Sequence, residues 1–344
     1  MSDAMDYRLL GRSGLKVSKL CLGTMNFGDQ TDLAAATKIV DSARKAGINF
    51  IDTADGYADG KSESMVGQIL KKDRDDWIVA TKVGSSQGTP RRHKGLSRKW
   101  MLEAIDDSLG RLQTDRVDIY YMHHVDWETP LEESILAMGD IIAAGKALYW
   151  GFSNHRPWQI AEIVRLCDAL GTPRPVICQP YYNAMNRMPE NDLLPACEYF
   201  GIGVVPYSPL ARGVLTGKYE PGKAPPKDTR AGRGDRRMMQ TEFREESLAA
   251  AKKIAAHAAK RNTTPIAFAL NWVLNTRLVT SVIAGPRTLA QWQGYLDALD
   301  YAFTAQDEAL LDKLVAAGHP SSPGYFDPRY PPAGRPTRTA APDK

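Results

Sequence analysis

The stretch Phe50-Ile-Asp52-Thr-Ala-Asp-Gly-Tyr57, together with Trp77-Ile-Val-Ala-Thr-Lys82, decides how this chain folds. Each stretch begins as a short apolar run, which is typical of a buried strand, and ends on groups that can carry chemistry. A third apolar run, at 117–122, ends at His123. If these strands are parallel neighbours in one barrel, the acid, the phenol, the amine and the imidazole meet at one mouth. Such a set of groups suits proton transfer and indicates an enzyme.

Strand and helix signals alternate along the rest of the chain. Buried strands are predicted at 18–22, 49–51, 77–81, 117–122, 147–150, 176–178, 203–205 and 278–283. Helical periodicity fills the intervals, and two further helices follow the last strand; the helices are predicted at 32–46, 62–70, 97–112, 129–145, 157–170, 192–200, 244–261 and 265–275. Parallel strands need such crossovers, and eight of them close a barrel. We therefore expect an α/β fold, a (β/α)8 TIM barrel with long loops on the face where the strands end.

The two ends of the chain and one internal segment depart from this alternation. Residues 7–17 predict an N-terminal β-hairpin, since Gly11-Arg-Ser-Gly14 supplies a turn. Residues 221–240 are rich in Gly, Pro and Arg and are predicted to form a mobile loop. In this interpretation residues 1–318 form a single barrel domain, and the Pro/Gly-rich tail 319–344 is extended or disordered.

Composition and charge limit the functional classes. The 344 residues are 43% hydrophobic and 24% charged, and the net charge of +4 does not demand a nucleic-acid partner. No apolar run approaches the ~20 residues of a membrane helix, and the polar N-terminus lacks the features of a signal peptide. The cysteines form no metal or redox motif; they are Cys21, Cys167, Cys178 and Cys197. We expect a cytoplasmic protein with reduced cysteines and without a membrane or nucleic-acid partner, as a monomer or a homo-oligomer.

The four groups at the strand ends form a plausible acid–base set. The phenol of Tyr57 ordinarily ionises near pH 10, and the ammonium of Lys82 would favour the phenolate and lower that value. Asp52 can hold Lys82 in its charged form, and His123 can orient an oxygen beside Tyr57. Such a set protonates a carbonyl oxygen while a cofactor delivers hydride, because no side chain donates hydride. A metal site involving His124 is disfavoured, because adjacent strand residues point to opposite faces, and no metal is expected.

The chain has no standard dinucleotide-binding fingerprint. Gly201-Ile-Gly203 lacks the third glycine, and Gly213-Val-Leu-Thr-Gly-Lys218 has the wrong spacing for a phosphate-binding P-loop. The strand ends nevertheless offer amides, hydroxyls, an aromatic ring and cations; these belong to Ser153, Asn154, Gln179, Tyr207, Ser208, Arg212, Lys218 and Arg287. Phosphate sites near the seventh and eighth strands are frequent in this barrel.

In these motifs the chain resembles the aldo-keto reductase superfamily, in order and over nearly its whole length. The matching segments are Leu22-Gly-Thr24, Asp52-Thr-Ala-Asp-Gly-Tyr57, Thr81-Lys82, Asp118-Ile-Tyr-Tyr-Met-His123, Gly151-Phe-Ser-Asn154, Gln179, Pro206-Tyr-Ser-Pro-Leu210 and Ile283-Ala-Gly-Pro-Arg287. The resemblance implies an oxidoreductase that moves hydride between NADPH and the carbonyl of an aldehyde or ketone, with NADH less favoured. It also implies a catalytic tetrad of Asp52, Tyr57, Lys82 and His123, in which Tyr57 is the general acid or base.

The resemblance further implies which residues hold the cofactor. Ser153, Asn154 and Gln179 would grip the carboxamide, and Tyr207 would stack on the nicotinamide. The whole implied set is Gly23, Thr24, Ser153, Asn154, Gln179, Tyr207, Ser208, Leu210, Arg212, Lys218, Gly285, Arg287 and Gln291. Family members commonly place Glu and Asn where this chain has Gly294 and Tyr295, so Tyr295 would stack on the adenine instead.

Two alternative functions stay open at this point. Lys82 could form a Schiff base with a carbonyl substrate, as in an aldolase. The chain could also be a nucleotide-binding regulatory subunit of the potassium-channel type, with little turnover. The physiological substrate and the net direction are not fixed by the sequence, although side chains that could line a substrate pocket include Trp127, Trp158, Arg329 and Tyr330.

Overall fold

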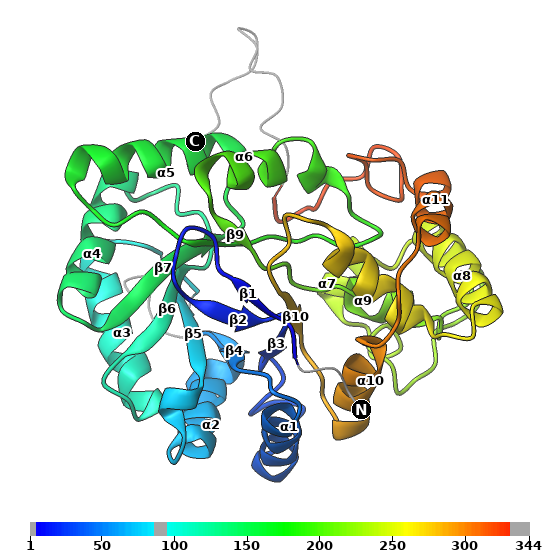
Figure 1. The fold of residues 1–344 in the computed structure, drawn as a ribbon, viewed down its shortest axis with the longest axis horizontal. Helices are drawn as coiled ribbons and strands as arrows, with labels where there is room; N and C mark the ends of the chain where they lie inside the picture. The colour runs from blue at the N-terminus through cyan, green and yellow to red at the C-terminus, as the bar shows by residue number, and fades with distance from the viewer. Residues whose placement is uncertain (1–4, 86–94, 331–344) are drawn as a thin grey trace, which may run out of the picture.

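A ring of parallel strands surrounded by helices makes up the body of the protein (Figure 1). The computed structural model describes residues 5–85 and 95–330. The 8-stranded sheet has the order β10-β3-β4-β5-β6-β7-β8-β9, with all neighbours parallel. The strands are β3 (Leu20–Gly23), β4 (Phe50–Asp52), β5 (Ile78–Val83), β6 (Val117–Met122), β7 (Ala147–Ser153), β8 (Ile177–Gln179), β9 (Gly203–Val204) and β10 (Val282–Ala284).

The ring closes between β9 and the segment that leads into β10. Val204 and Val279 form a parallel bridge, and the amide of Thr280 donates to the carbonyl of Val204 at 2.8 Å. Farther along, the amide of Ile283 donates to the carbonyl of Pro206 at 3.0 Å. The predicted (β/α)8 barrel is therefore confirmed.

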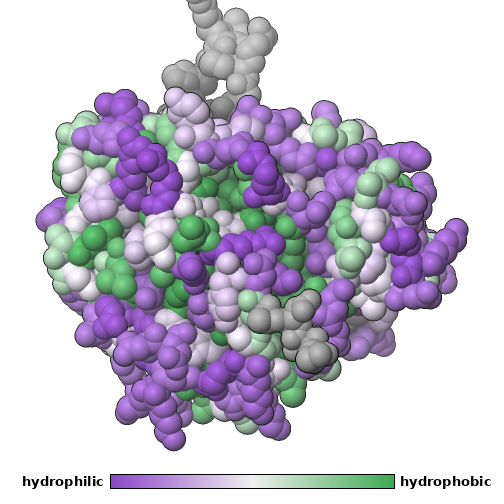
Figure 2. All heavy atoms as spheres, in the orientation of Figure 1, coloured by the Kyte–Doolittle hydropathy of each residue, from purple (hydrophilic) through white to green (hydrophobic). Residues whose placement is uncertain are grey.

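The helices follow the predicted alternation and cover the outside of the ring (Figure 1). They are α1 (Leu33–Lys45), α2 (Lys61–Leu70), α3 (Arg98–Leu112), α4 (Leu131–Ala143), α5 (Pro157–Leu170), α6 (Leu193–Phe200), α7 (Arg236–Thr241), α8 (Glu245–Lys260), α9 (Pro265–Asn275), α10 (Leu289–Ala298) and α11 (Ala305–Leu314). No helix in the described ranges is long and apolar enough to cross a lipid bilayer. Figure 2 shows hydrophilic side chains over much of the face seen in Figure 1.

The N-terminal hairpin closes the end of the barrel opposite the strand ends. It consists of β1 (Tyr7–Leu9) and β2 (Lys16–Ser18), and Leu10 and Val17 are buried with the inward-facing apolar side chains of the strands. Gly11 has φ of +54°, and a Cβ there would lie 2.5 Å from the carbonyl oxygen of Val176. Glycine is therefore required where the hairpin touches the barrel.

Two segments on the opposite face are those for which the sequence predicts a loop and an extended or disordered tail. The segment 221–240, predicted as a loop, contains most of helix α7. The side chain of Asp235 caps the start of this helix by accepting a hydrogen bond from the amide of Met238. The tail from 319 has no helix or strand up to Tyr330, yet the Ser321 amide donates to the carbonyl of Met185 at 2.9 Å. The rest of the predicted tail, 331–344, lies outside the described residues.

Candidate active site

A cavity of about 560 Å³ opens at the carboxyl ends of the strands. Asp52, Tyr57 and His123 line it, and Lys82 lies directly behind Tyr57. The structure also brings together around this cavity the whole predicted cofactor set, namely Gly23, Thr24, Ser153, Asn154, Gln179, Tyr207, Ser208, Leu210, Arg212, Lys218, Gly285, Arg287 and Gln291. Groups that are far apart in the sequence therefore share one site.

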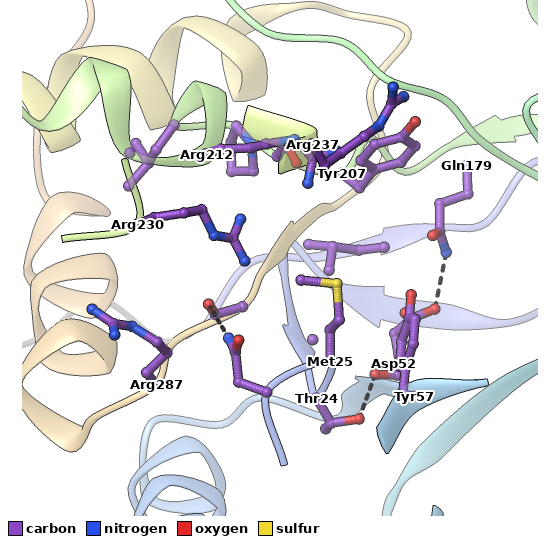
Figure 3. A pocket seen from close by; sticks show the side chains of 18 of the residues that line it. Thr24, Met25, Asp52, Tyr57, Gln179, Tyr207, Arg212, Arg230, Arg237 and Arg287 are labelled. Carbon is purple, nitrogen blue, oxygen red and sulfur yellow. Dashed lines mark hydrogen bonds between the residues drawn. The ribbon is translucent and has the colours of Figure 1, made fainter. Parts of the chain in front are cut away.

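Lys82 is the centre of the polar group at the cavity floor. Its Nζ lies 2.5 Å from Asp52 Oδ1, 2.7 Å from the carbonyl oxygen of Thr53 and 3.2 Å from Tyr57 Oη. An ammonium has three N–H donors, so all of them are used. Asp52 and Lys82 lie on the neighbouring strands β4 and β5, and Asp52 pairs in register with Ala80, two residues before Lys82. Gln179 donates to the other Asp52 oxygen at 2.9 Å (Figure 3).

The ion pair of this group is buried, since the side chains of Lys82 and Asp52 are 0% and 2% exposed. Burial lowers the pKa of Lys82, but Asp52 and Tyr57 together outweigh burial and raise it above its ordinary value. Burial also raises the pKa of Tyr57, and the nearby Lys82 only partly offsets this effect. Lys82 thus favours the phenolate as predicted, but the pKa of Tyr57 is not lowered overall, because the cost of burying the phenolate is larger. Tyr57 is a protonated phenol at neutral pH, ready to donate.

The two adjacent histidines lie together beside Tyr57. The His123 ring is perpendicular to the Tyr57 ring, with centroids 5.8 Å apart, and the His124 ring stacks on His123 at 4.2 Å. The expectation that these histidines face opposite sides is wrong, because β6 ends at Met122 and strand alternation no longer applies. Burial, with smaller contributions from His124 and Lys82, lowers the pKa of His123 well below its usual range, so its imidazole is neutral. Within the described residues, no group of three or more His, Cys, Asp or Glu could hold a metal ion.

The amide groups at the ends of β7 and β8 are already hydrogen-bonded within the protein. Asn154 Oδ1 accepts from Tyr207 Oη at 3.0 Å, and its Nδ2 donates to the carbonyl of His123 at 2.9 Å. Ser153 Oγ donates to the carbonyl of Gln179 at 2.7 Å. These bonds fix the Tyr207 ring and the His123 backbone relative to each other, which the sequence did not show.

Cations gather on the side of the cavity away from Tyr57. In Figure 3 Arg230 and Arg287 lie across the cavity from Tyr57 and Asp52. Arg287 Nη1 donates to the side chain of Gln30 at 3.3 Å. Arg212 Nε lies 3.1 Å from Glu242 Oε2 and forms an ion pair with it. Glu242 is fully buried and was not predicted as part of the site. This side of the cavity is therefore suited to negatively charged groups.

Several residues that line or support the cavity were missed by the sequence analysis; they are Met25, Asn26, Ser85, Arg230, Asp235, Arg237 and Glu242. The concentration of arginines between 230 and 237 is the one signal that could have identified part of this set. Tyr295 lines the cavity, and a Cβ added at Gly294 would meet open space.

Of the side chains considered for a substrate pocket, only two line the cavity. Arg329 and Tyr330 do so, from the C-terminal segment. Trp127 and Trp158 instead contact each other, with ring centroids 6.5 Å apart, and are 74% and 61% exposed. They are absent from the cavity lining, so the two tryptophans belong to the outer surface.

Comparison with known proteins finds similar sequences over nearly the whole chain. A sequence model of the Aldo/keto reductase family matches residues 19–316. The "Probable voltage-gated potassium channel subunit beta" of Oryza sativa subsp. japonica is 36% identical over 317 residues, which cover 91% of this chain and 96% of the relative. The "L-glyceraldehyde 3-phosphate reductase" of Escherichia coli (strain K12) is 34% identical over 326 residues, which cover 91% of this chain and 93% of the relative. An uncharacterised oxidoreductase of Bacillus subtilis (strain 168) is 33% identical, with 90% and 96% covered.

Proposed function

The chain belongs to the aldo/keto reductase family, and on this basis we propose that it is an NADPH-dependent oxidoreductase acting on aldehydes or ketones. It reduces the carbonyl to an alcohol and can catalyse the reverse oxidation. The observation that carries the proposal is the placement of Lys82 Nζ 3.2 Å from Tyr57 Oη, with Asp52 behind it and His123 beside it, at the floor of an open cavity.

The residues around the cavity fit a dinucleotide that carries an additional phosphate. Lys218 and Arg287 have no ion-pair partner within the described residues, so their charges can bind phosphate oxygens. Arg287 and Gln291 would hold the 2′-phosphate, and Ser208, Leu210, Arg212 and Lys218 would hold the pyrophosphate. Near the catalytic floor, Ser153 and Gln179 would bind the carboxamide, and the ring of Tyr207 would lie on the nicotinamide. When bound, the cofactor supplies the hydride.

The side chains of the tetrad then handle the proton. The carbonyl oxygen of the substrate sits between Tyr57 Oη and the neutral His123, each of which can donate a hydrogen bond to it. As the carbonyl carbon gains hydride, Tyr57 gives its proton to the oxygen, and an alcohol forms. The resulting phenolate is stabilised by the ammonium of Lys82, which Asp52 keeps charged, until a proton from solvent restores the phenol.

The Schiff-base alternative is not favoured by the surroundings of Lys82. A nucleophilic lysine needs a lowered pKa, because only the free amine attacks a carbonyl. Asp52 and Tyr57 overcome the effect of burial and raise the pKa of Lys82. All three of its N–H groups are also taken by acceptors.

A channel-subunit role is a second candidate, because potassium channel β subunits are among the relatives. The two proposals predict different behaviour. A reductase oxidises NADPH when an aldehyde is added, whereas a purely regulatory subunit binds the nucleotide and turns over poorly. We also propose a cytoplasmic location, which the four free, buried cysteines support.

A carbonyl panel tests the proposed function. The purified protein is mixed with NADPH or NADH and with aldehydes, ketones and sugars, and the loss of reduced cofactor is followed by absorbance. The panel includes phosphorylated aldehydes because one relative is named for reducing one. Faster turnover with NADPH than with NADH supports the proposal. Tight NADPH binding without turnover of any carbonyl would favour the channel-subunit role.

A further inference from the structure

The cations of the cavity divide into those with a carboxylate partner and those without one. Three ion pairs are present, Arg212 with Glu242, Arg230 with Asp235 and Arg237 with Asp327. Within residues 5–85 and 95–330, the other cavity cations have no ion-pair partner; they are Lys218, Arg287 and Arg329. Lys218 and Arg287 are assigned to phosphates of the cofactor in the proposed function. Arg329 remains as a positive charge without an assigned partner.

Arg329 lies on the catalytic side of the cavity, beside the stacked histidines. Its Nη2 is 3.2 Å from His124 Nε2. The His124 ring lies 4.2 Å from that of His123, which in turn contacts the ring of Tyr57 edge-on. A substrate whose carbonyl is placed at Tyr57 and His123 can therefore extend past His124 to the guanidinium of Arg329.

The segment that carries Arg329 is held on both sides of this residue. Before it, Asp327 pairs with Arg237 of helix α7 and also accepts from the amide of Arg329 at 2.9 Å. After it, the carbonyl of Tyr330 accepts from Arg156 Nη2 at 2.8 Å. The guanidinium is thus presented to the cavity by an anchored backbone, which reduces the entropy lost when a ligand binds.

His124 does not neutralise Arg329. Burial and the charge of Arg329 lower the pKa of His124 to about 3, so the imidazole is neutral at physiological pH. Arginine can only donate, so Nε2 of His124 accepts from it. Nδ1 then carries the hydrogen and donates to Tyr330 Oη at 2.9 Å. The histidine is fixed in one tautomer, and the positive charge of Arg329 stays available.

We propose that Arg329 binds an anionic group of the substrate, so that the preferred substrates are aldehydes or ketones carrying a carboxylate or a phosphate. The planar guanidinium matches either group through two parallel hydrogen bonds. This inference rests on the proposed function, because it takes the reacting carbonyl to sit at Tyr57 and His123.

Matched pairs of substrates test the inference. One pair is glyceraldehyde 3-phosphate against glyceraldehyde, and the other is 4-oxobutanoate against butanal. The measured quantity is the ratio of kcat/KM for the charged member to that for the neutral member. A general loss of activity lowers both values of kcat/KM by the same factor and leaves their ratio unchanged. A charge-assisted contact predicts that Arg329→Gln lowers the ratio by about tenfold or more. Arg329→Lys keeps the charge and is expected to retain an intermediate ratio.

The control is Arg165→Gln, a surface arginine on α5 that pairs with Glu162, which is expected to keep the wild-type ratio. If the ratio of kcat/KM falls for only one pair of substrates, the charged group of that pair, carboxylate or phosphate, is the one that Arg329 recognises. A wild-type ratio near one in both pairs, or an unchanged ratio in Arg329→Gln, overturns the inference and leaves the proposed function intact. If the wild-type protein oxidises NADPH with none of these four compounds but does so with other carbonyls of the panel, the inference is overturned and the proposed function stands; no turnover with any carbonyl overturns both.

Discussion

Lys82 donates to the hydroxyl of Tyr57 at 3.2 Å while its two shorter hydrogen bonds go to Asp52 and to the backbone of Thr53. The ammonium is thus held by acceptors that do not change during a reaction, and the phenol is the one partner that can gain or lose a proton. This arrangement makes the roles of the two side chains separable by mutation.

Replacing Tyr57 with Phe removes the proton donor but keeps the shape of the ring. We expect kcat for carbonyl reduction to fall by about 10²–10⁴-fold, while NADPH binding, measured by fluorescence titration, stays close to that of the wild type. Tyr7→Phe makes the same chemical change on the hairpin, where the hydroxyl donates to the carbonyl of Gly47, and should keep wild-type turnover. Wild-type rates in Tyr57→Phe would disprove its role as general acid.

Replacing Lys82 with Met leaves the carboxylate of Asp52 buried without its cation. We expect a loss of about 3–5 kcal/mol in the free energy of unfolding, measured by chemical denaturation. The double variant Lys82→Met/Asp52→Asn has no unpaired charge and should lose less than the sum of the two single variants. Lys99→Met, which breaks the exposed pair with Glu103, should change stability little. Additive losses would show that the two buried groups are not energetically coupled.

The buried Asp55 should make stability depend on pH. Burial, with a contribution from the charge of Glu63, raises the pKa of Asp55 to about 8 in the folded protein, whereas the ordinary value is about 3.9. The stability that it contributes is fully present below pH ~4 and is lost as the pH rises to about 8, because only the unfolded chain ionises in that window. In Asp55→Asn this loss is absent, so its free energy of unfolding relative to wild type should rise by about 1.4 kcal/mol per pH unit between these limits. A difference that does not vary with pH would contradict the shift.

Arg287 should distinguish NADPH from NADH. If it binds the 2′-phosphate, Arg287→Gln lowers the ratio of kcat/KM for NADPH to that for NADH by about tenfold. The exposed Arg277, which pairs with Glu198 on the surface, provides the control, since Arg277→Gln should keep the wild-type ratio. If Arg287→Gln also keeps it, the phosphate is bound elsewhere.

The hairpin turn should tolerate a side chain at one glycine and not at the other. Gly11→Ala places a methyl group 2.5 Å from the carbonyl oxygen of Val176 at a φ of +54°, and we expect it to lower the free energy of unfolding by about 1–3 kcal/mol. At Gly14 an added Cβ meets nothing within 4 Å, so Gly14→Ala should remain near the wild-type melting temperature. Equal melting temperatures in both variants would mean that the hairpin shifts to make room.

The barrel and the catalytic floor were predictable because their signals are local. Apolar runs mark the strands, and Asp52 and Lys82 follow from the rule that functional groups lie at the carboxyl ends of barrel strands. The contacts made by the C-terminal segment 327–330 beside the cavity are not local. Tyr330 meets His124 across 206 positions of sequence, and Asp327 meets Arg237 across 90, so no periodic pattern indicates them.

The pKa of Tyr57 was mispredicted for a different reason. The sequence shows that a lysine is near, but it does not show how completely water is excluded, and in this site burial has the larger effect. The stacking of His123 on His124 was missed because strand alternation was applied to two residues that lie beyond Met122, where β6 ends. Both corrections depend on packing that only the folded chain reveals.

Residues 327–330, which are anchored over the cavity, come after every barrel strand in the sequence. Because a chain emerges from the ribosome with its N-terminal part first, every barrel strand is available to fold before Arg329 appears. A polypeptide that stopped at the end of α11 would keep the tetrad and the cations of the cofactor side while lacking the wall formed by Arg329 and Tyr330. Substitutions at Arg329 and Tyr330 can therefore alter which substrates enter the cavity while the barrel beneath them still folds.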